Sequence, residues 1–253
     1  MKKLRTLSAV VLTKNQEKNI VECIKSLTFC DEVLVIDDNS IDKTIYLARS
    51  NGAKVFSRSL NNDFSSQRNF GLEKAKGEWV LFLDADEKVS DELQKEILRE
   101  LNLKDNPYTG YYFRRSDFIW GRELKFGETG NIKLLRLAKK GSGKWKRKVH
   151  EVWQIEGRIK TLRNPLIHHP HQTLSEFIAD INFHTNLDIS AKIQEGKRSS
   201  LLKIIYWPIA KFKLNWLLRL GFLDETQGFV IAILMSFHSF LSWSKLWQNQ
   251  KKN

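Results

Sequence analysis

The chain of 253 residues is long enough to bury a sizeable core, and its hydrophobic fraction of 42% excludes wholesale disorder. Lys and Arg number 42 against 29 Asp and Glu, which gives a formal net charge of +13. This excess favours an anionic partner, whether nucleic acid, acidic lipid headgroups or a phosphorylated substrate. The two cysteines, Cys23 and Cys30, lack metal or redox spacing and fit a reducing cytosol.

The N-terminal stretch MKKLRTLSAVVL has a basic start and a short apolar run, but no small-residue cleavage site follows it. We therefore expect a first strand over Leu7–Leu12 rather than a signal peptide. No stretch reaches the roughly 18 uncharged apolar residues that span a bilayer. The run Gly228–Trp243 comes nearest, and polar residues interrupt it.

Strands and helices are expected to alternate through the first hundred residues. Apolar periodicity, capping residues and glycine stops predict this order. The expected strands are 7–12, 32–36, 54–58 and 79–83, and the expected helices are 20–27, 40–50, 63–75 and 90–102. This succession predicts a parallel sheet with right-handed crossovers.

The stretch WVLFLDADE, residues 79–87, places two carboxylates directly after a strand that reads as buried on both faces. Asp84 and Asp86, two positions apart, would point to one side in an extended chain. Ligands of open α/β sheets bind outside the carboxyl ends of the strands, and paired carboxylates can hold a hard divalent cation. The alternative is an acidic turn that only ends the strand.

Polar residues also follow the first two strands and should lie at the same edge of the sheet. They are Thr13, Asn15, Glu17, Asp37 and Asp38. Their carboxylates could accept hydrogen bonds from a nucleobase imide and ribose hydroxyls, although turns and helix caps would explain each cluster separately. Neither GxGxxG nor GxxxxGK[ST] is present, which argues against a dinucleotide or P-loop site.

The helix expected over 63–75 carries Gln67 and Arg68 on the face that should be apolar. A buried arginine requires a partner. That partner could be a carboxylate of the sheet, a structural role, or a bound phosphate, a functional one. Gly71 beside it permits close backbone approach in either case.

Three sequences, LSAVVLTKNQEKNI, DEVLVIDDNSIDKT and SSQRNFGLEKAKGEWVLFLDADE, together resemble the nucleotide-sugar half of a family 2 glycosyltransferase with the GT-A fold. The resemblance implies an α/β fold with a mainly parallel sheet flanked by helices. It implies that the residues after strands one and two hold the nucleoside, that the QRN arginine lies near the donor, and that the DxD pair binds ribose and a metal, Mg²⁺ or Mn²⁺. The matching positions are Thr13, Asn15, Glu17, Asp38 and, with a weaker match, Asp37 for the nucleoside, Arg68 for the donor, Asp84 for ribose and metal, and Asp86 for the metal.

The second half should extend the sheet with strands over 111–115, 132–137 and 149–154. An inverting transferase needs a carboxylate that takes the proton of the acceptor hydroxyl. The ED pair common in family 2 is absent, but KWKRKVHEVW and PLIHHPHQTLSEF are similar to a subgroup that includes lipopolysaccharide core β-1,4-glucosyltransferases. On that similarity Glu151 is the expected base.

The sequence allows more than one role for each of four histidines. Strand alternation would send His150 and Glu151 to opposite faces, so His150 is either a packed residue, a metal ligand or an acceptor contact. His168, His169 and His171 could suggest zinc, but their spacing matches no standard site and a polar strand end is the alternative.

The organisation changes at residue 173, where Thr173 and Glu176 predict a capping box that opens a long helix. Beyond it, tryptophans and aliphatic residues interleave with lysines and arginines, which suits an acidic membrane surface. The alternative is a helical pair packed on the catalytic domain or on a second subunit. Pro208 is expected to kink or break this segment.

We therefore expect a GT-A catalytic domain over residues 1–172, with a donor half 1–104 and an acceptor half 105–172, and a helical, membrane-associating appendage over 173–253. The expected reaction is metal-dependent inverting transfer of a hexose, from UDP-glucose, to a lipid-linked saccharide such as lipopolysaccharide inner core, on the cytoplasmic face of the membrane. A polyprenyl-phosphate or other glycan transferase is the alternative. A nucleic-acid-binding module is a remote one, because no helix-turn-helix, zinc or aromatic-platform signature accompanies the charge.

Overall fold

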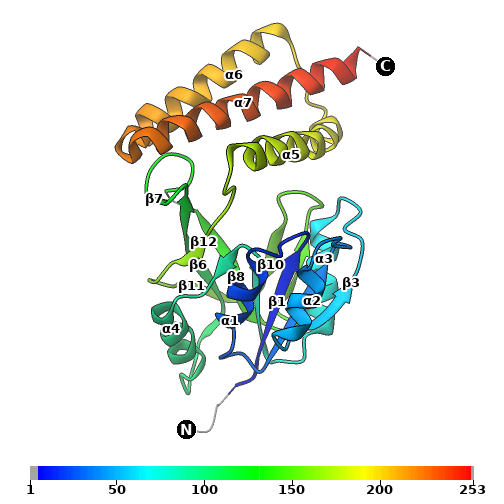
Figure 1. Ribbon diagram of the computed structural model, residues 1–253, viewed down its shortest axis with the longest axis vertical. Coiled ribbons are helices and arrows are strands. Elements are labelled where there is room, and N and C mark those ends of the chain that lie inside the picture. Colours follow the sequence, from blue (N-terminus) through cyan, green and yellow to red (C-terminus); the bar gives the residue numbers. More distant parts are fainter. Residues whose placement is uncertain (1–4, 131, 252–253) are drawn as a thin grey trace. The chain divides into compact units, whose positions relative to one another are not determined.

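The computed structural model describes residues 5–130 and 132–251 (Figure 1). The chain forms two compact units. The N-terminal unit comprises the chain up to Arg115 together with Lys133–His168, and the C-terminal unit comprises Ser116–Ile132 and the chain from His169 onward. The sequence suggested a single boundary at residue 172, whereas the structure groups the internal segment Ser116–Ile132 with the C-terminal helices.

The first half of the N-terminal unit alternates strands and helices as expected. The elements are β1 (Leu7–Thr13), α1 (Ile20–Lys25), β2 (Glu32–Asp37), α2 (Thr44–Ser50), β3 (Lys54–Ser57), α3 (Phe64–Lys74), β4 (Trp79–Asp84) and α4 (Asp91–Leu101). The four strands are parallel and lie in the order β3-β2-β1-β4. The register pairs Thr13 with Asp37 and Leu12 with Asp84, so three strands end at one edge of the sheet.

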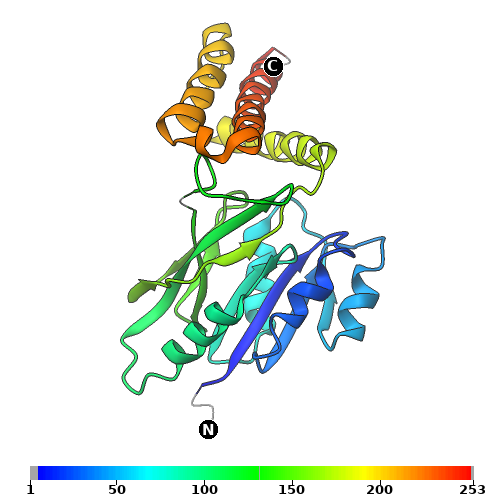
Figure 2. The same cartoon turned by 60° about the vertical axis from the view of Figure 1, so that its left-hand side comes forward.

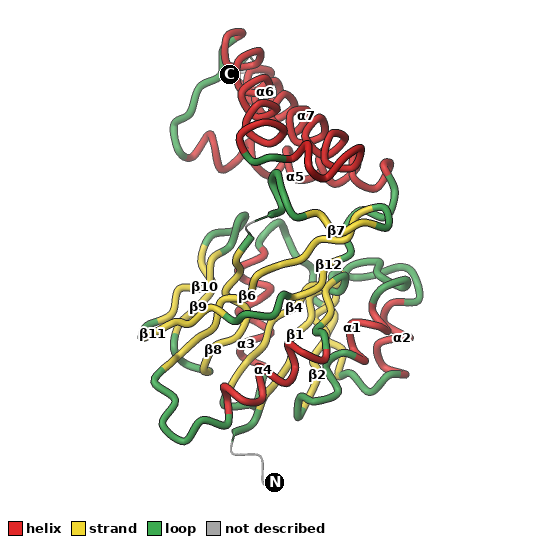
Figure 3. The backbone as a smooth tube through the Cα atoms, turned by 90° about the vertical axis from the view of Figure 1, so that its left-hand side faces the viewer, coloured by secondary structure: helices red, strands yellow, loops and turns green. Residues whose placement is uncertain are grey.

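Each face of this sheet has its own hydrophobic core, because both faces are covered (Figure 3). One core joins alternate residues of β1 and β4 to apolar residues of α1, α2 and α4. The other joins the remaining residues of these strands to α3 and to two tryptophans, Trp145 and Trp153. The strand Trp79–Leu83 is fully buried, as its uninterrupted apolar run predicts.

Helix α3 lies close against the sheet. Asp63 caps its first turn by accepting a hydrogen bond from the backbone N–H of Ser66 at 2.8 Å. A Cβ atom built on Gly71 would lie 2.4 Å from Cγ1 of Val10, so only glycine permits this approach. The expectation that this helix buries Gln67 and Arg68 is confirmed, since their exposed fractions are 2% and 3%.

The second half of the unit adds further strands, most of which pair antiparallel with their neighbours. These are β5 (Glu87–Lys88), β6 (Tyr108–Ile119), β8 (Lys133–Lys139), β9 (Gly143–Lys146), β10 (Val152–Ile155), β11 (Arg158–Thr161) and β12 (Leu166–His168). Strand β8 pairs antiparallel with both β4 and β6, and β12 pairs antiparallel with β5. Strand β11 pairs parallel with β6, and β9 and β10 form a separate antiparallel ribbon.

The strand expected over 149–154 begins later than predicted, at Val152. His150 has a φ of 53°, in the left-handed region that interrupts a strand. Glu151 and His150 therefore precede the ribbon strand, and the prediction from strand alternation does not apply to them.

The C-terminal unit is mainly helical. It contains β7 (Arg122–Leu124), paired with the end of β6, then α5 (Leu174–Gln194), α6 (Leu201–Lys213), a π-helical turn (Leu214–Leu218), a 3₁₀ turn (Gly221–Asp224) and α7 (Glu225–Gln250). Helices α6 and α7 run side by side (Figure 2). The capping box is confirmed, because Thr173 and Glu176 exchange hydrogen bonds at 3.1 Å. Pro208 lies inside α6 and does not end it.

The internal segment Ser116–Ile132 belongs to this unit for a physical reason. Ile119 and Leu124 enter a hydrophobic cluster with residues of α5 and α7. The carboxylate of Asp224 also accepts hydrogen bonds from the backbone N–H groups of Lys125 and Phe126.

Helix α6 contains no buried residue. Large apolar side chains are exposed along it, including Leu202 at 79% and Tyr206 at 63%. Among the described residues, one helical stretch, Gly221–Gln250, is long and apolar enough to cross a membrane by length and composition, which is weak evidence by itself.

Candidate active site

The loops that follow β1 and β2 are cross-linked at the edge of the sheet. Asn15 accepts a hydrogen bond from the backbone N–H of Ile41 at 2.9 Å, and Glu17 accepts one from Lys43 at 3.1 Å. Lys14 pairs with Asp38 at 2.7 Å. Asn15, Glu17 and Asp38 therefore lie on two loops that are directly connected.

Asp37 and Asp38 differ in their surroundings. Asp37 is fully buried, and its two oxygens accept hydrogen bonds from the backbone and hydroxyl of Ser40. The side chain of Asp38 is 14% exposed and accepts from Leu60 N–H at 2.9 Å. Asp37 thus stabilises the turn itself, while Asp38 lies at its surface.

Thr13 ends β1 beside these loops. Its hydroxyl oxygen is buried and has no hydrogen-bond partner within the part of the chain that the structure describes. A buried hydroxyl without a partner is costly. This position is therefore suited to a ligand or water that supplies the missing bond.

A chain of ion pairs runs through the end of β4. Arg68 of α3 donates from Nη2 to Asp84 at 2.9 Å and from Nε to Glu151 at 2.8 Å. Arg136 of β8 donates from Nη2 to the other oxygen of Asp84 at 2.6 Å and to Glu87 at 2.9 Å. Of the two partners that the sequence left open for Arg68, the structure supplies carboxylates.

Burial raises the pKa of a carboxyl group, and the arginine contacts lower it. Burial alone would raise the pKa of Asp84, but Arg136 and Arg68 hold that pKa well below its ordinary value. Burial raises the pKa of Glu87 despite the attraction of Arg136. The carboxylate of Asp84 is therefore ionised throughout the physiological range.

Glu151 reaches Arg68 because the ribbon β9–β10 is attached to α3. The side chain of Asn69 exchanges two hydrogen bonds with the backbone of Trp145, at 2.9 and 3.0 Å. The guanidinium of Arg68 lies 4.7 Å from the ring centroid of Trp145. The segment between the ribbon strands then brings Glu151 to the end of β4.

Asp86 has a different partner from the other carboxylates of this region. One of its oxygens lies 3.3 Å from Nε2 of His168, at the end of β12. Asp84 and Asp86 do not belong to a metal site built from the described protein side chains alone. Among the described residues, no group of three or more His, Cys, Asp or Glu side chains could hold a metal ion. For the same described residues, the zinc alternative for the three late histidines is not supported.

Sequence reasoning missed Arg136 and Glu87. Glu87 ends the acidic stretch, and its side chain is fully buried. Arg136 lies within the apolar strand sequence KLLRLA and is 4% exposed. The argument that singled out Arg68, a charged residue on a buried face, would have found Arg136 as well.

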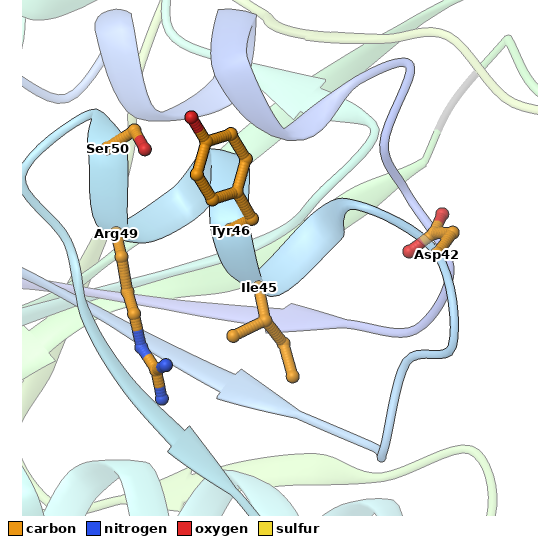
Figure 4. Close-up of a pocket in the computed structure, with 5 residues that line it drawn as sticks. All are labelled: Asp42, Ile45, Tyr46, Arg49 and Ser50. Atoms are coloured by element: carbon orange, nitrogen blue, oxygen red, sulfur yellow. The ribbon is translucent and has the colours of Figure 1, made fainter.

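A shallow depression elsewhere on the unit lies over α2 and contains none of these groups. Figure 4 shows its lining of Asp42, Ile45, Tyr46, Arg49 and Ser50. Its residues make no buried ion pair, so the candidate site remains the edge of the sheet.

The sequence profile of Glycosyl transferase family 2 matches residues 8–173, which include every residue of this site. The chain belongs to this family. The GT-A fold and the glycosyltransferase activity implied by the sequence motifs are thereby confirmed.

Individual relatives of this family 2 glycosyltransferase span its length. The lipopolysaccharide core biosynthesis glycosyltransferase LpsC of Rhizobium meliloti is 28% identical, over 96% of this chain and 92% of that protein. An uncharacterized glycosyltransferase of Rickettsia bellii is also 28% identical, over 96% of this chain and 86% of that protein.

Two solved structures also resemble the chain. Glucosyl-3-phosphoglycerate synthase of Mycobacterium tuberculosis, in complex with Mn²⁺, UDP and glucosyl-3-phosphoglycerate, is 25% identical over 46% of this chain and 45% of that chain, with a TM-score of 0.37. TarS of S. aureus is 15% identical over 98% of this chain and 91% of that chain, with a TM-score of 0.47.

Proposed function

We propose that this protein is an inverting, metal-dependent transferase that moves a hexose from a UDP-sugar, UDP-glucose, to a lipid-linked saccharide and forms a β-linkage. The observation that supports this most directly is the contact of Arg68 with both Asp84 and Glu151. It joins the DAD turn of the donor half to the expected base of the acceptor half. A single site can then hold both substrates.

A divalent cation fits the charges of this site. Two guanidinium groups, Arg68 and Arg136, contact three carboxylates, Asp84, Glu87 and Glu151. With the neighbouring carboxylate of Asp86, the ionised groups carry two net negative charges. Mg²⁺ and Mn²⁺ sites in such enzymes need only one or two protein carboxylates, because substrate phosphates and water complete the coordination. Asp86, with Asp84 beside it, would hold the ion, which would neutralise charge on the leaving diphosphate.

The donor nucleoside would bind along the loops after β1 and β2. Asp38 lies at their surface, and the Thr13 hydroxyl is without a partner among the described residues. Asn15 and Glu17 connect the two loops and maintain their spacing. These residues supply acceptors for a nucleobase imide and for ribose hydroxyls.

Glu151 is the proposed base. Its carboxylate would accept the proton of the acceptor hydroxyl while that oxygen attacks the anomeric carbon from the face opposite the nucleotide. Arg68 holds one oxygen of the carboxylate, Oε1, at 2.8 Å through Nε, and the second oxygen would meet the substrate. Arg68 thus orients the base, and it would also lie near the donor.

The acceptor class follows from charge and from the relatives. The exposed Lys144, Lys146, Arg147 and Lys148 precede Glu151 and would attract a phosphorylated saccharide. The relative LpsC takes part in lipopolysaccharide core biosynthesis. We therefore propose a lipopolysaccharide inner core as the acceptor, met at the cytoplasmic face of the membrane.

The C-terminal unit would bind that membrane peripherally. Its exposed apolar side chains on α6 lie beside Lys203 and Lys213, a combination suited to anionic headgroups and the acyl boundary. From Gly196 onward the sequence contains only two acidic residues, Asp224 and Glu225.

A screen of nucleotide sugars by thermal shift, with and without Mn²⁺, tests the donor assignment. We expect stabilisation by UDP and UDP-glucose only when the metal is present. Product analysis with defined lipid-linked acceptors then separates a lipopolysaccharide core acceptor from a polyprenyl phosphate. Stabilisation by GDP-sugars alone would refute the UDP assignment.

A further inference from the structure

Strand β8 contains an irregularity at Arg136. On the neighbouring strand β6, the consecutive residues Tyr111 and Tyr112 pair with Leu137 and Leu135, so Arg136 is an extra residue with no opposite partner in this register. The register of β8 with β4 covers Leu137 through Lys139 and does not include Arg136. This arrangement has the form of a β-bulge.

The bulge changes the face to which residues point. Leu135 and Leu137 are two positions apart and would share one face of a regular strand. Instead, Leu135 lies in the core beside α3 and Leu137 lies in the core beside α1 and α4. The extra residue thus reorients this segment of β8, and Arg136 is directed at the end of β4.

At that end, a single nitrogen of Arg136 contacts two carboxylates. Nη2 donates to Asp84 at 2.6 Å and to Glu87 at 2.9 Å. The second oxygen of Glu87 accepts a hydrogen bond from the backbone N–H of Asp84 at 2.9 Å. Arg136 and Glu87 therefore fix both the side chain and the backbone of Asp84.

From this geometry we propose that Arg136, directed by the bulge and anchored by Glu87, is a positioning residue that sets the orientation of the Asp84 carboxylate for the nucleotide and its metal. The inference rests on the proposed function. Arg136 itself is buried at 4% exposure and acts through Asp84. A buried ion pair is not needed for stability alone, since apolar residues of similar volume often stabilise a fold as well.

The alternative roles of Arg136 predict opposite effects on metal binding. A cation 2.6 Å from a metal ligand repels the metal, so if Arg136 only neutralised charge its removal would tighten binding of Mn²⁺ and UDP. If Arg136 positions Asp84, its removal weakens that binding. If Arg136 had only a structural role, its removal would lower thermal stability and leave the affinity of the folded protein for UDP and Mn²⁺ unchanged.

The test is calorimetric binding of UDP in the presence of Mn²⁺ to the full chain and to Arg136→Met, Arg136→Lys and Glu87→Gln. We expect at least a tenfold weaker affinity for Arg136→Met and smaller losses for Arg136→Lys and Glu87→Gln, which keep a charge or a hydrogen bond. A further variant, Arg136→Ala, should also bind more weakly, and guanidinium ion at millimolar concentration should partly restore its binding. The matched control is Glu100→Gln, which removes the ion pair with Lys160, formed at 2.9 Å between α4 and β11.

Three outcomes separate the possibilities. Unchanged or tighter binding by Arg136→Met, with normal wild-type binding, would overturn this inference alone. If Arg136→Met does not fold, Arg136→Lys and Glu87→Gln decide in the same way. A wild-type protein that does not bind UDP with Mn²⁺ would overturn the proposed function and this inference with it.

Discussion

Nε of Arg68 lies 2.8 Å from Oε1 of Glu151, a residue 83 positions further along the chain. The same guanidinium contacts Asp84. Arg68 therefore links the DAD turn, which ends the central strand, to the expected base in the segment between the ribbon strands. Each half of the proposed reaction depends on a carboxylate that this one arginine holds.

Substitution of Glu151 by Gln should separate binding from turnover. The amide oxygen can still accept the hydrogen bond of Arg68, but it cannot take a proton at neutral pH. We expect unchanged calorimetric affinity for UDP with Mn²⁺ and a turnover at least about 100-fold lower. Glu156→Gln, at an exposed position in the following turn, is the control. Near-normal turnover by Glu151→Gln would place the base elsewhere.

Substitution of Asp86 by Ala should remove the metal dependence of donor binding. Its carboxylate lies 3.3 Å from His168 and, unlike that of Asp84, contacts no arginine in the ion-pair chain. We expect UDP affinity measured by calorimetry to become weak and equal with and without Mn²⁺. Asp105→Ala changes an exposed loop carboxylate and should bind as the wild type does. Retained metal-dependent affinity in Asp86→Ala would refute the metal role.

Charged substitutions on α6 should reduce membrane binding without affecting the N-terminal unit. Leu202 and Ile205 are 79% and 52% exposed, so glutamate at these positions adds repulsion from anionic lipid at little cost in packing. We expect wild-type protein to sediment with vesicles that contain anionic lipid and the double variant to remain in solution. Leu202→Ala with Ile205→Ala is the charge-free control. Equal sedimentation of wild type and glutamate variant would argue that this surface contacts protein instead.

The acid stability of the N-terminal unit should depend on Glu96 of α4. Burial alone would raise its pKa, but the N–H groups of Arg163 and Asn164, together with the Asn164 side chain, lower that pKa. A depressed pKa in the folded state contributes stability above the unfolded pKa, about 4.3, and that contribution is lost as the pH falls.

We therefore expect Glu96→Gln to lower the free energy of urea unfolding by about 1 to 2 kcal/mol at neutral pH. The difference from wild type should shrink as the pH falls below about 4. Asp105→Asn, at an exposed loop position, should leave the profile unchanged. A difference that persists at acid pH would show that Glu96 acts through packing and not through its charge.

Local patterns predicted much of the donor half. The helices expected over 63–75 and 90–102 are present, with Asp63 and Ser90 as their caps, and the buried strand before Asp84 follows from its apolar run. These features depend on neighbours within a few positions, which a sequence displays directly. The burial of Arg68 also followed from helix periodicity.

Contacts between distant segments could not be predicted in the same way. The bulge at Arg136 depends on the register of three strands, and the pairing of Asp86 with His168 depends on where β12 ends. The late start of β10 depends on the left-handed conformation of His150, which is uncommon for non-glycine residues even though histidine adopts it more often than most. The roles of Thr13, Asn15, Glu17 and Asp38 toward a nucleoside stay predictions.

The contact of Asp224 with the backbone of Lys125 and Phe126 has a consequence for biosynthesis. About 100 residues separate these two N–H groups from the carboxylate that accepts their hydrogen bonds. The segment Ser116–Ile132 therefore leaves the ribosome long before the helices that pack on Ile119 and Leu124. The N-terminal unit can fold in the meantime, while this segment has no helices to pack against until translation ends. Nascent chains arrested before residue 224 should therefore be cleaved by protease within this segment, and released full-length protein should resist cleavage there.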